Sequence, residues 1–337
     1  MRHPAIYRVL VPAKGESGET YLVLKSRLEL LMKNGQIHQF SRSEGRLDIN
    51  EDQRKQQKTG YAGPERRACN IVDFSLFPLS IEEQLQRTHS WEAILGYGQK
   101  AQEIAAKLRS VANTSLSVLI YGSTGTGKGI VALMLHEMSN RKDKPFIKMD
   151  CGAIPTALIW DELFGYKKGS HTGASQSKPG RFQLAEGGTI FLDEIASLNL
   201  DLQRSLLGFL EERVINSPDD ENPARLDVRV VSATNANLPD WVRDGHFRED
   251  LFYRLNEFEL DMPPLRERAD DLWYLATRFL CMANAEFETS VFGFSAAAVD
   301  YLSKCDWRGN IRELKNLITR ATLFAGGVIE VEHLVYC

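Results

Sequence analysis

The sequence predicts an α/β fold in which helices cover both faces of a parallel sheet. The first observation is a series of short, almost continuous apolar runs, and the second is their alternation with amphipathic segments of helical period. Strands that are buried on both faces have this pattern, because helices shield both sides of a parallel sheet. The third observation is that helical patterns alone follow Pro263 and Pro264, which predicts a small helical lid.

The composition limits the class of protein. The 337-residue chain is long enough for two or three compact units. Its 43% hydrophobic and 26% charged residues are typical of globular proteins, and a formal charge of -4 excludes a general basic field for nucleic acid. The five cysteines are far apart without metal-binding spacing, and no run resembles a signal peptide or a membrane span. We therefore expect a cytoplasmic protein without membrane contact.

The expected elements follow one another along the chain. Residues 1–50 hold the β-type runs YRVLV and TYLVL and the amphipathic segment SRLELLMKNG, which predict a small α+β module with a regulatory role. Residues 51–90 are expected to form a linker and connector, because the stretch from Asn50 to Arg67 is polar and charged. Residues 91–262 hold the strands SVLIYG, PFIKMD, GTIFLDE and VRVVSATN, with helices from about Gly127 to Ser139 and over LNLDLQRSLLGFLEE. Residues 263–337 form the helical lid.

The segment LIYGSTGTGKG predicts a phosphate-binding loop, because an apolar strand precedes it and an amphipathic helix follows it. Its glycines let the backbone N–H groups point at phosphate oxygens, and the ammonium of Lys128 reaches the outer phosphates. Ser or Thr usually follows this lysine and contacts magnesium, whereas Gly129 has no side chain. The predicted nucleotide-binding residues of this loop are Gly122, Ser123, Thr124, Gly125, Thr126, Gly127, Lys128 and Gly129.

Two acids end the apolar strand in GGTIFLDEI. We expect Asp193 to hold Mg²⁺, directly or through water, and Glu194 to polarise the attacking water as general base. Adjacent acids are also common as caps of a strand end, but a P-loop about 65 residues upstream favours the catalytic interpretation. The sequence therefore predicts an ATPase that uses ATP and Mg²⁺.

Residues from about Trp91 to Val335 resemble the AAA+ ATPase domain of bacterial enhancer-binding proteins, which activate RNA polymerase that carries sigma-54. The resemblance rests on motifs in one order: YGSTGTGKG, DELFGYKKGSHTGA, GGTIFLDEI, SATN, FREDLFYRLNEFELDMPPLRER and WRGNIREL. It implies an AAA+ P-loop NTPase fold with a helical lid. It also implies that copies of the chain assemble into a hexameric ring.

The resemblance implies roles for residues outside the P-loop. Asn235, which ends SATN, matches a sensor of the γ-phosphate, and Arg312 in WRGNIREL matches a second sensor in the lid. Arg248 and Arg254 match arginine fingers that enter the ATP site of the neighbouring subunit, where such a guanidinium speeds hydrolysis by about 10³ to 10⁵. Without the resemblance, these arginines are typical of a solvated helix surface. Asp150 matches a polar switch residue that contacts the general base.

The segment GYKKGSHTGA matches the family's G-A-F-T-G-A loop, which contacts sigma-54 when ATP reorganises the ring. Ser170 and His171 replace the small alanine and the aromatic phenylalanine, and an imidazole is smaller and more polar than a phenyl ring. A polar stretch from Asn216 to Arg225 matches the family's second mobile loop in place only. The predicted sigma-factor loop consists of Gly169, Ser170, His171, Thr172, Gly173 and Ala174.

Two functions are compatible with these observations. In the first, the chain is a transcription activator whose ATPase ring remodels the sigma-54 RNA polymerase holoenzyme to permit promoter opening. In the second, ATP acts mainly as an assembly signal, and the altered loop contacts another form of polymerase or no polymerase. Family members continue past the lid into a helix-turn-helix that binds enhancer DNA, whereas this sequence stops at Cys337. We therefore expect contact with DNA only through a C-terminal module that this sequence lacks.

Overall fold

The computed structural model describes residues 6–11, 19–24, 39–42, 45–48, 95–96, 98–166, 177–214 and 225–335. The chain forms two compact units. One unit joins Met1–Gln99 with Leu265–Cys337, and the other spans Lys100–Pro264 and contains the P-loop and the acid pair. Within the described residues, no helix combines the length and the apolar character needed to cross a membrane.

The unit Lys100–Pro264 is built on a five-stranded parallel sheet with the strand order β11-β5-β10-β9-β6. The sequence predicts four of these strands and misses β11, whose charged residues alternate with apolar ones at the edge of the sheet. The predicted helix-covered parallel sheet is confirmed. The strands are β5 (Val118–Tyr121), β6 (Phe146–Asp150), β9 (Thr189–Asp193), β10 (Arg229–Thr234) and β11 (Phe258–Asp261).

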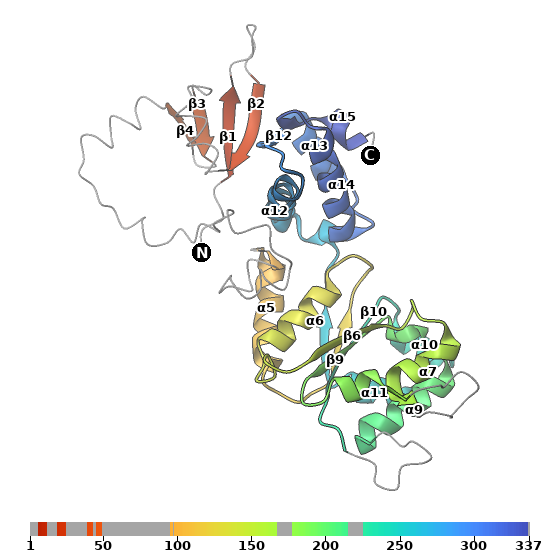
Figure 1. The fold of residues 1–337 in the computed structure, drawn as a ribbon. Helices are drawn as coiled ribbons and strands as arrows, with labels where there is room; N and C mark the ends of the chain where they lie inside the picture. Colours follow the sequence, from red (N-terminus) through yellow and green to blue (C-terminus); the bar gives the residue numbers. More distant parts are fainter. Residues whose placement is uncertain are drawn as a thin grey trace, which may run out of the picture. The chain divides into compact units, whose positions relative to one another are not determined.

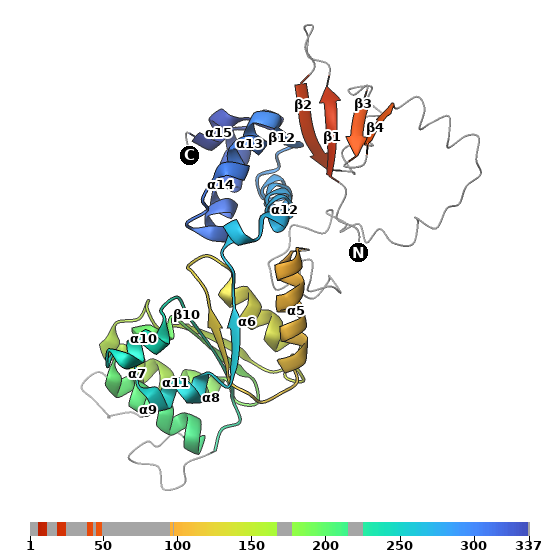
Figure 2. The ribbon, with the colours of Figure 1, turned by 180° about the vertical axis from the view of Figure 1, so that it is seen from behind.

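Helices cover both faces of this sheet, as Figure 1 and Figure 2 show from opposite sides. On one face lie α5 (Gln99–Val111) and α6 (Lys128–Glu137). On the other face lie α7 (Thr156–Phe164), α9 (Leu200–Glu212) and α11 (Glu249–Leu255). Both helices predicted in this unit are confirmed as α6 and α9. The shorter elements are the hairpin β7 (Gly165–Tyr166) and β8 (Lys178–Pro179), α8 (Arg181–Leu184), the 3-10 helix Ile195–Ser197 and α10 (Leu238–Arg243).

The core under α7, α9 and α11 holds the strand ends in place. Leu119, Ile190 and Leu192 from the sheet and Leu206 and Leu251 from the helices are completely buried in one cluster. Burial of each such side chain contributes about 1.5–3 kcal/mol relative to its exposure to water. The polar residues that follow these strands are therefore held in fixed positions by the buried sheet.

The lid region is mainly helical, as predicted. Its helices pack around a second apolar cluster that includes Leu275, Leu302, Leu314 and Ile318. The expectation that strands stop after Pro264 is wrong, because two very short strands pair in parallel, and such strands are too short to show a period of two. The elements are the 3-10 helix Leu265–Glu267, α12 (Ala269–Phe287), β12 (Gly293–Ser295), α13 (Ala296–Lys304), α14 (Asn310–Phe324), β13 (Val328–Ile329) and α15 (Val331–Val335).

Four N-terminal strands belong to the same unit as the lid helices. They form an antiparallel sheet, and β2 also pairs with β12, which gives the order β13-β12-β2-β1-β3-β4. The strands predicted at YRVLV and TYLVL are confirmed as β1 and β2. The amphipathic segment SRLELLMKNG and the linker 51–90 lie outside the described residues. The strands are β1 (Ile6–Val11), β2 (Glu19–Leu24), β3 (Gln39–Arg42) and β4 (Gly45–Asp48).

Candidate active site

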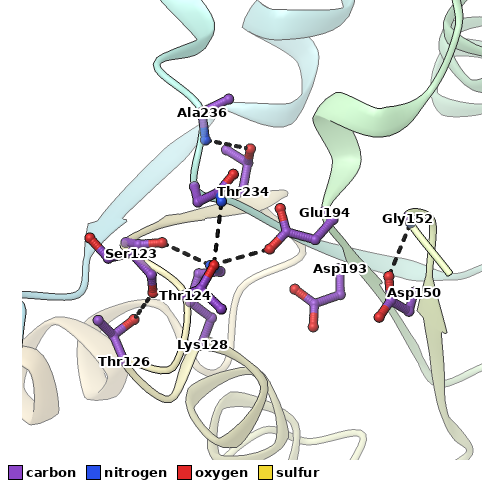
Figure 3. Close-up of polar contacts among 12 residues, drawn as sticks. Ser123, Thr124, Thr126, Lys128, Asp150, Gly152, Asp193, Glu194, Thr234 and Ala236 are labelled. Carbon is purple, nitrogen blue, oxygen red and sulfur yellow. Dashed lines mark hydrogen bonds and ion pairs between the residues drawn. The ribbon is translucent and has the colours of Figure 1, made fainter. Parts of the chain in front are cut away.

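The predicted P-loop connects β5 to α6 at the carboxyl edge of the sheet (Figure 3). The N–H of Gly122 donates to the carbonyl oxygen of Thr234 at 3.2 Å, which ties the loop to β10. The hydroxyl of Thr126 donates to the carbonyl oxygen of Ser123 at 2.9 Å and closes the turn. Gly127 immediately precedes α6 and has φ 99, a left-handed conformation that favours glycine. The backbone therefore curls as phosphate binding requires.

The first glycine of the loop is required by a close approach of two chain segments. The N–H of Met262 donates to the carbonyl oxygen of Tyr121 at 2.7 Å, so the chain leaving β11 runs directly past the loop. A Cβ atom at Gly122 would lie 2.8 Å from the Cβ and 2.9 Å from the carbonyl oxygen of Met262. Any side chain at position 122 would therefore push the loop away from β11.

Lys128 and Glu194 meet beside this loop. The ammonium of Lys128 donates to the carbonyl oxygen of Gly122 at 2.8 Å and lies 3.6 Å from Oε1 of Glu194 (Figure 3). Asp193 ends β9, and Glu194 follows it with φ 53, a left-handed backbone that costs a residue other than glycine about 1–2 kcal/mol. This turn directs the Glu194 carboxylate at the P-loop lysine. The sequence predicted this proximity but gave no sign of the unusual backbone.

Lys148 of β6 is a site residue that was not predicted. Its ammonium lies 3.6 Å from Oδ2 of Asp193 and 5.7 Å from the centre of the Phe191 ring. The parallel register places Lys148 opposite Phe191 and Asp150 opposite Asp193, so a lysine two residues before a predicted site residue reaches the same edge. That spacing was the available signal, because alternate residues of a strand share one face.

The carboxylate of Asp150 accepts hydrogen bonds from the backbone of the turn that follows it. Its Oδ1 accepts hydrogen bonds from the N–H groups of Gly152 at 3.0 Å and Ala153 at 3.2 Å. The neighbouring Cys151 is buried, and burial together with the adjacent carboxylates raises the pKa of its thiol to about 12. The thiol therefore stays protonated near neutral pH, and the chemistry of this site belongs to the oxygen and nitrogen groups.

Asn235 lies immediately after β10 and reaches the P-loop. Its side-chain amide donates to the hydroxyl of Thr124 at 3.4 Å, a long hydrogen bond. The preceding Thr234 is completely buried, and its hydroxyl accepts a hydrogen bond from the N–H of Ala236 at 3.0 Å (Figure 3). The end of β10 therefore places an amide at the edge where the phosphate-binding loop begins.

Both predicted arginine fingers have partners within the chain. Arg248 precedes α11 and donates from Nε and Nη2 to the carboxylate of Asp250 at 3.0 and 2.6 Å, which raises the pKa of the arginine and lowers that of the aspartate. Arg254 donates to the carbonyl oxygen of Leu210 at 3.2 Å. The backbone N–H of Arg248 donates to the side chain of Gln203 at 2.8 Å. Gln203 is completely buried and was not predicted to position this arginine.

Arg312, the predicted lid sensor, is the third residue of α14 and is exposed. The N–H of Gly309, which precedes the helix, donates to the carboxylate of Glu313 at 2.8 Å. Glu313 therefore satisfies one of the free N–H groups at the start of this helix. Arg312 belongs to the unit that contains the lid, whereas the P-loop belongs to the other unit.

The predicted sigma-factor loop, Gly169 to Ala174, lies outside the described residues, as do residues 216–224 of the second predicted loop. The stem of the first loop is described and consists of the hairpin β7 and β8. Glu162 of α7 accepts hydrogen bonds from Lys178 and, at 3.1 and 3.2 Å, from Arg181. These contacts lower the pKa of Glu162, and the hydrogen bond from Lys178 has the largest effect. One carboxylate of α7 therefore contacts two basic residues that follow the loop.

Comparisons with known proteins agree with this geometry. The sigma-54 interaction domain family matches residues 94–261, and the AAA+ ATPase lid domain family matches residues 266–336. The DNA-binding transcriptional activator HyfR of Escherichia coli is 42% identical over 73% of this chain and 37% of its own length. The nitric oxide reductase transcription regulator NorR1 of Cupriavidus necator is 44% identical over 68% of this chain and 45% of its own length.

The chain thus spans less than half the length of these two relatives. A solved structure of NtrX from Brucella abortus in complex with ATP has a TM-score of 0.65 and 26% identity, and the match covers 75% of this chain and 55% of that one. The predicted resemblance is therefore confirmed by both the sequence and the fold. The chain belongs to the sigma-54-dependent transcriptional activators and carries their AAA+ ATPase domain with its lid.

Proposed function

We propose that this chain is the motor of a cytoplasmic transcription activator, which hydrolyses ATP to remodel the sigma-54 RNA polymerase holoenzyme so that the promoter opens. The observation that supports this most directly is the pairing of the P-loop lysine with a strand-end acid. Lys128 and Glu194 lie 3.6 Å apart at the carboxyl edge of the sheet, next to Asp193. NtrX, which has a similar fold, has been solved with ATP and with ADP.

The groups at this edge fit a magnesium nucleotide. Carboxylate oxygens are the ligands that Mg²⁺ prefers, and this ion usually binds one or two carboxylates together with substrate phosphates and waters. Asp193 would hold the ion directly or through water, since Gly129 supplies no hydroxyl. When bound, Mg²⁺ neutralises charge on the transferring phosphoryl group.

The protein groups supply the remaining chemistry. The N–H groups of the P-loop bind phosphate oxygens, and Lys128 places a positive charge beside the outer phosphates. Glu194 orients the attacking water and accepts its proton. Asn235, which contacts Thr124 of the loop, senses the γ-phosphate. Asp150 gives up its hydrogen bond to Gly152 and contacts Glu194, which links the sensing of the γ-phosphate to the general base.

A ring of copies would complete the site. Arg248 and Arg254 enter the ATP site of the neighbouring copy, where they stabilise the charge of the transition state. Arg248 must then exchange its bond to Asp250 for a bond to phosphate. The lid contributes Arg312, and the loop from Gly169 to Ala174 transmits the change to sigma-54.

The test is steady-state ATP hydrolysis as a function of protein concentration. Turnover per chain should rise cooperatively with concentration, and Arg248→Ala should lower it by at least about a thousandfold without loss of ATP binding. Arg243→Ala is the matched control, because Arg243 is an exposed arginine that pairs with Asp240 on α10. A rate per chain that is independent of concentration would exclude the shared site. ATP binding without turnover would favour the alternative in which ATP is only an assembly signal.

The sigma-54 contact has its own test. The chain loaded with a transition-state analogue of ATP should co-elute with sigma-54 from a sizing column, and the nucleotide-free chain should not. Failure of the wild-type chain to co-elute, with recovery in His171→Phe, would show that this loop has lost the sigma-54 contact. Failure of both chains would reject the sigma-54 partner while leaving the ATPase intact.

A further inference from the structure

A second lysine lies at the nucleotide site, outside the P-loop. Lys148 extends from β6, and its ammonium lies 3.6 Å from Oδ2 of Asp193, the expected magnesium ligand. Asp193 is 19% exposed, whereas the lysine side chain is 55% exposed. The acid is thus held by the fold, and the ammonium can leave it without disturbing the core.

The position of this ammonium is linked to the unusual glycine after the P-loop lysine. A Cβ atom built at Gly129 would lie 3.5 Å from the Nζ atom of Lys148 and 3.5 Å from the Phe191 ring. The ammonium therefore lies between the start of α6 and Asp193, in space that a side chain at position 129 would share. In most P-loop proteins a serine or threonine at this position directs its hydroxyl to magnesium.

The two acids at the end of β9 are thus paired with two lysines. Lys128 lies 3.6 Å from Glu194, and Lys148 lies 3.6 Å from Asp193. Each ammonium offsets the charge of one carboxylate while no cation is bound. A divalent cation that binds Asp193 must displace the Lys148 ammonium or be repelled by it. The repulsion would be substantial, because the two positive charges would lie only a few ångströms apart.

We propose that Lys148 is a built-in cation that competes with Mg²⁺ for Asp193 and supports binding of ATP when the metal is absent. With the metal absent, its positive charge stays beside the nucleotide phosphates. With the metal present, Lys148 raises the concentration of Mg²⁺ that the site requires. This inference rests on the proposed function, because it assumes that this edge binds magnesium and ATP.

The experiment measures the affinity of the full chain for a fluorescent ATP analogue, first in EDTA and then across a Mg²⁺ titration. Lys148→Met should weaken binding in EDTA and lower the Mg²⁺ concentration at the midpoint, each by about twofold to fivefold, as a partly exposed ion pair allows. Lys142→Met is the matched control, since Lys142 is an exposed lysine that precedes the same strand. Its midpoint should equal that of the wild type.

Gly129→Ser tests the same site by a second change. The fold should accommodate it, because a Cβ atom at position 129 would meet its neighbours only at ordinary contact distance. Its hydroxyl should also lower the Mg²⁺ midpoint. An unchanged midpoint in Lys148→Met, or an equal shift in Lys142→Met, would overturn the inference while wild-type ATP binding still supported the proposed function. A wild-type chain that binds no ATP analogue even with Mg²⁺ would overturn both.

Discussion

Single residues of the site are held in conformations that only their neighbours make stable. Glu194 has a left-handed backbone, and its carbonyl oxygen accepts a hydrogen bond from the N–H of Ser197 at 2.9 Å. Such strain persists where surrounding structure fixes it, and it is common at active sites. The buried sheet below and the short helix after Glu194 provide that fixation, so the carboxylate is positioned before ATP binds.

We expect Glu194→Gln to separate binding from hydrolysis. The amide keeps the shape of the side chain but cannot accept a proton from water, so turnover should fall by about 10² to 10⁴. The affinity for an ATP analogue should change little, because Lys128 and the P-loop backbone are untouched. Glu211→Gln, an exposed acid on α9, is the control. If Glu194→Gln hydrolysed ATP at the wild-type rate, another group would have to be the general base.

His136 should make stability depend on pH. It is 2% exposed, its Nδ1 lies 3.0 Å from the hydroxyl of Thr189, and burial lowers its pKa below the ordinary value. As pH falls, the imidazole of His136 is therefore protonated at a higher pH in the unfolded chain than in the folded chain. The stabilising contribution is complete above the unfolded pKa of about 6.5 and is lost as pH falls toward the folded value, at up to about 1.4 kcal/mol per pH unit.

Urea unfolding of the full chain between pH 7.5 and 5.5 checks this prediction, with pH values chosen on both sides of about 6.5. His136→Asn keeps a polar partner for Thr189 but does not titrate, so its stability should fall less steeply with acid. His246→Asn, at an exposed position, is the control. Equal slopes in wild type and His136→Asn would reject the assignment.

At the scale of elements, one carboxylate contacts the stem of the predicted sigma-factor loop. Glu162 connects α7 to Lys178 on β8 and to Arg181 on α8, while β7 and β8 pair over only two residues each. Two such residues give little stability without a side-chain clamp. These ion pairs therefore join α7 to the strand and the helix that follow the loop.

Glu162→Gln should loosen this stem while sparing the whole fold. Hydrogen exchange at the β7 and β8 amides should become faster, whereas the free energy of unfolding should fall by less than about 1 kcal/mol, since the pairs are partly exposed. Sigma-54 co-elution should weaken, and ATPase activity should remain. Asp201→Asn, which removes an exposed pair with Arg204 on α9, is the control. Unchanged exchange in Glu162→Gln would show that the clamp is dispensable.

At the scale of the whole molecule, the proposed site is divided between copies of the chain. In this structure, Asp250 binds Arg248 and the carbonyl oxygen of Leu210 binds Arg254. In the proposed ring, one copy would supply the P-loop, Asp193 and Glu194, and the next copy would supply the arginines. Closed rings follow from such head-to-tail contacts when the rotation closes.

Mixing two inactive variants tests this division. Glu194→Gln lacks the general base but keeps its arginines, and Arg248→Ala has the opposite defect. In mixed rings, sites with an intact base and an intact neighbouring arginine should restore roughly a quarter of wild-type turnover at equal proportions. A mixture as inactive as its components would show that both residues act within one copy. Mixing Glu194→Gln with a double variant of both residues is the control and should stay inactive.

The sequence by itself determined the class of fold, the P-loop and the acid pair, because these depend on local patterns. A strand shows as an apolar run, and Lys128 is marked by the glycines before it and the helix after it. The roles of Arg248 and Arg312 came from motif resemblance, and those roles stay predictions.

Only the tertiary structure decided which distant residues share the site. Lys148 meets Asp193 because β6 lies next to β9, and Gln203 meets Arg248 because α9 packs beside α11. Strand β11 was missed because its charged and apolar residues alternate at the sheet edge, where it pairs with β5, instead of forming a continuous apolar run. Contacts of this kind depend on strand order and helix packing, which join segments that no local pattern connects.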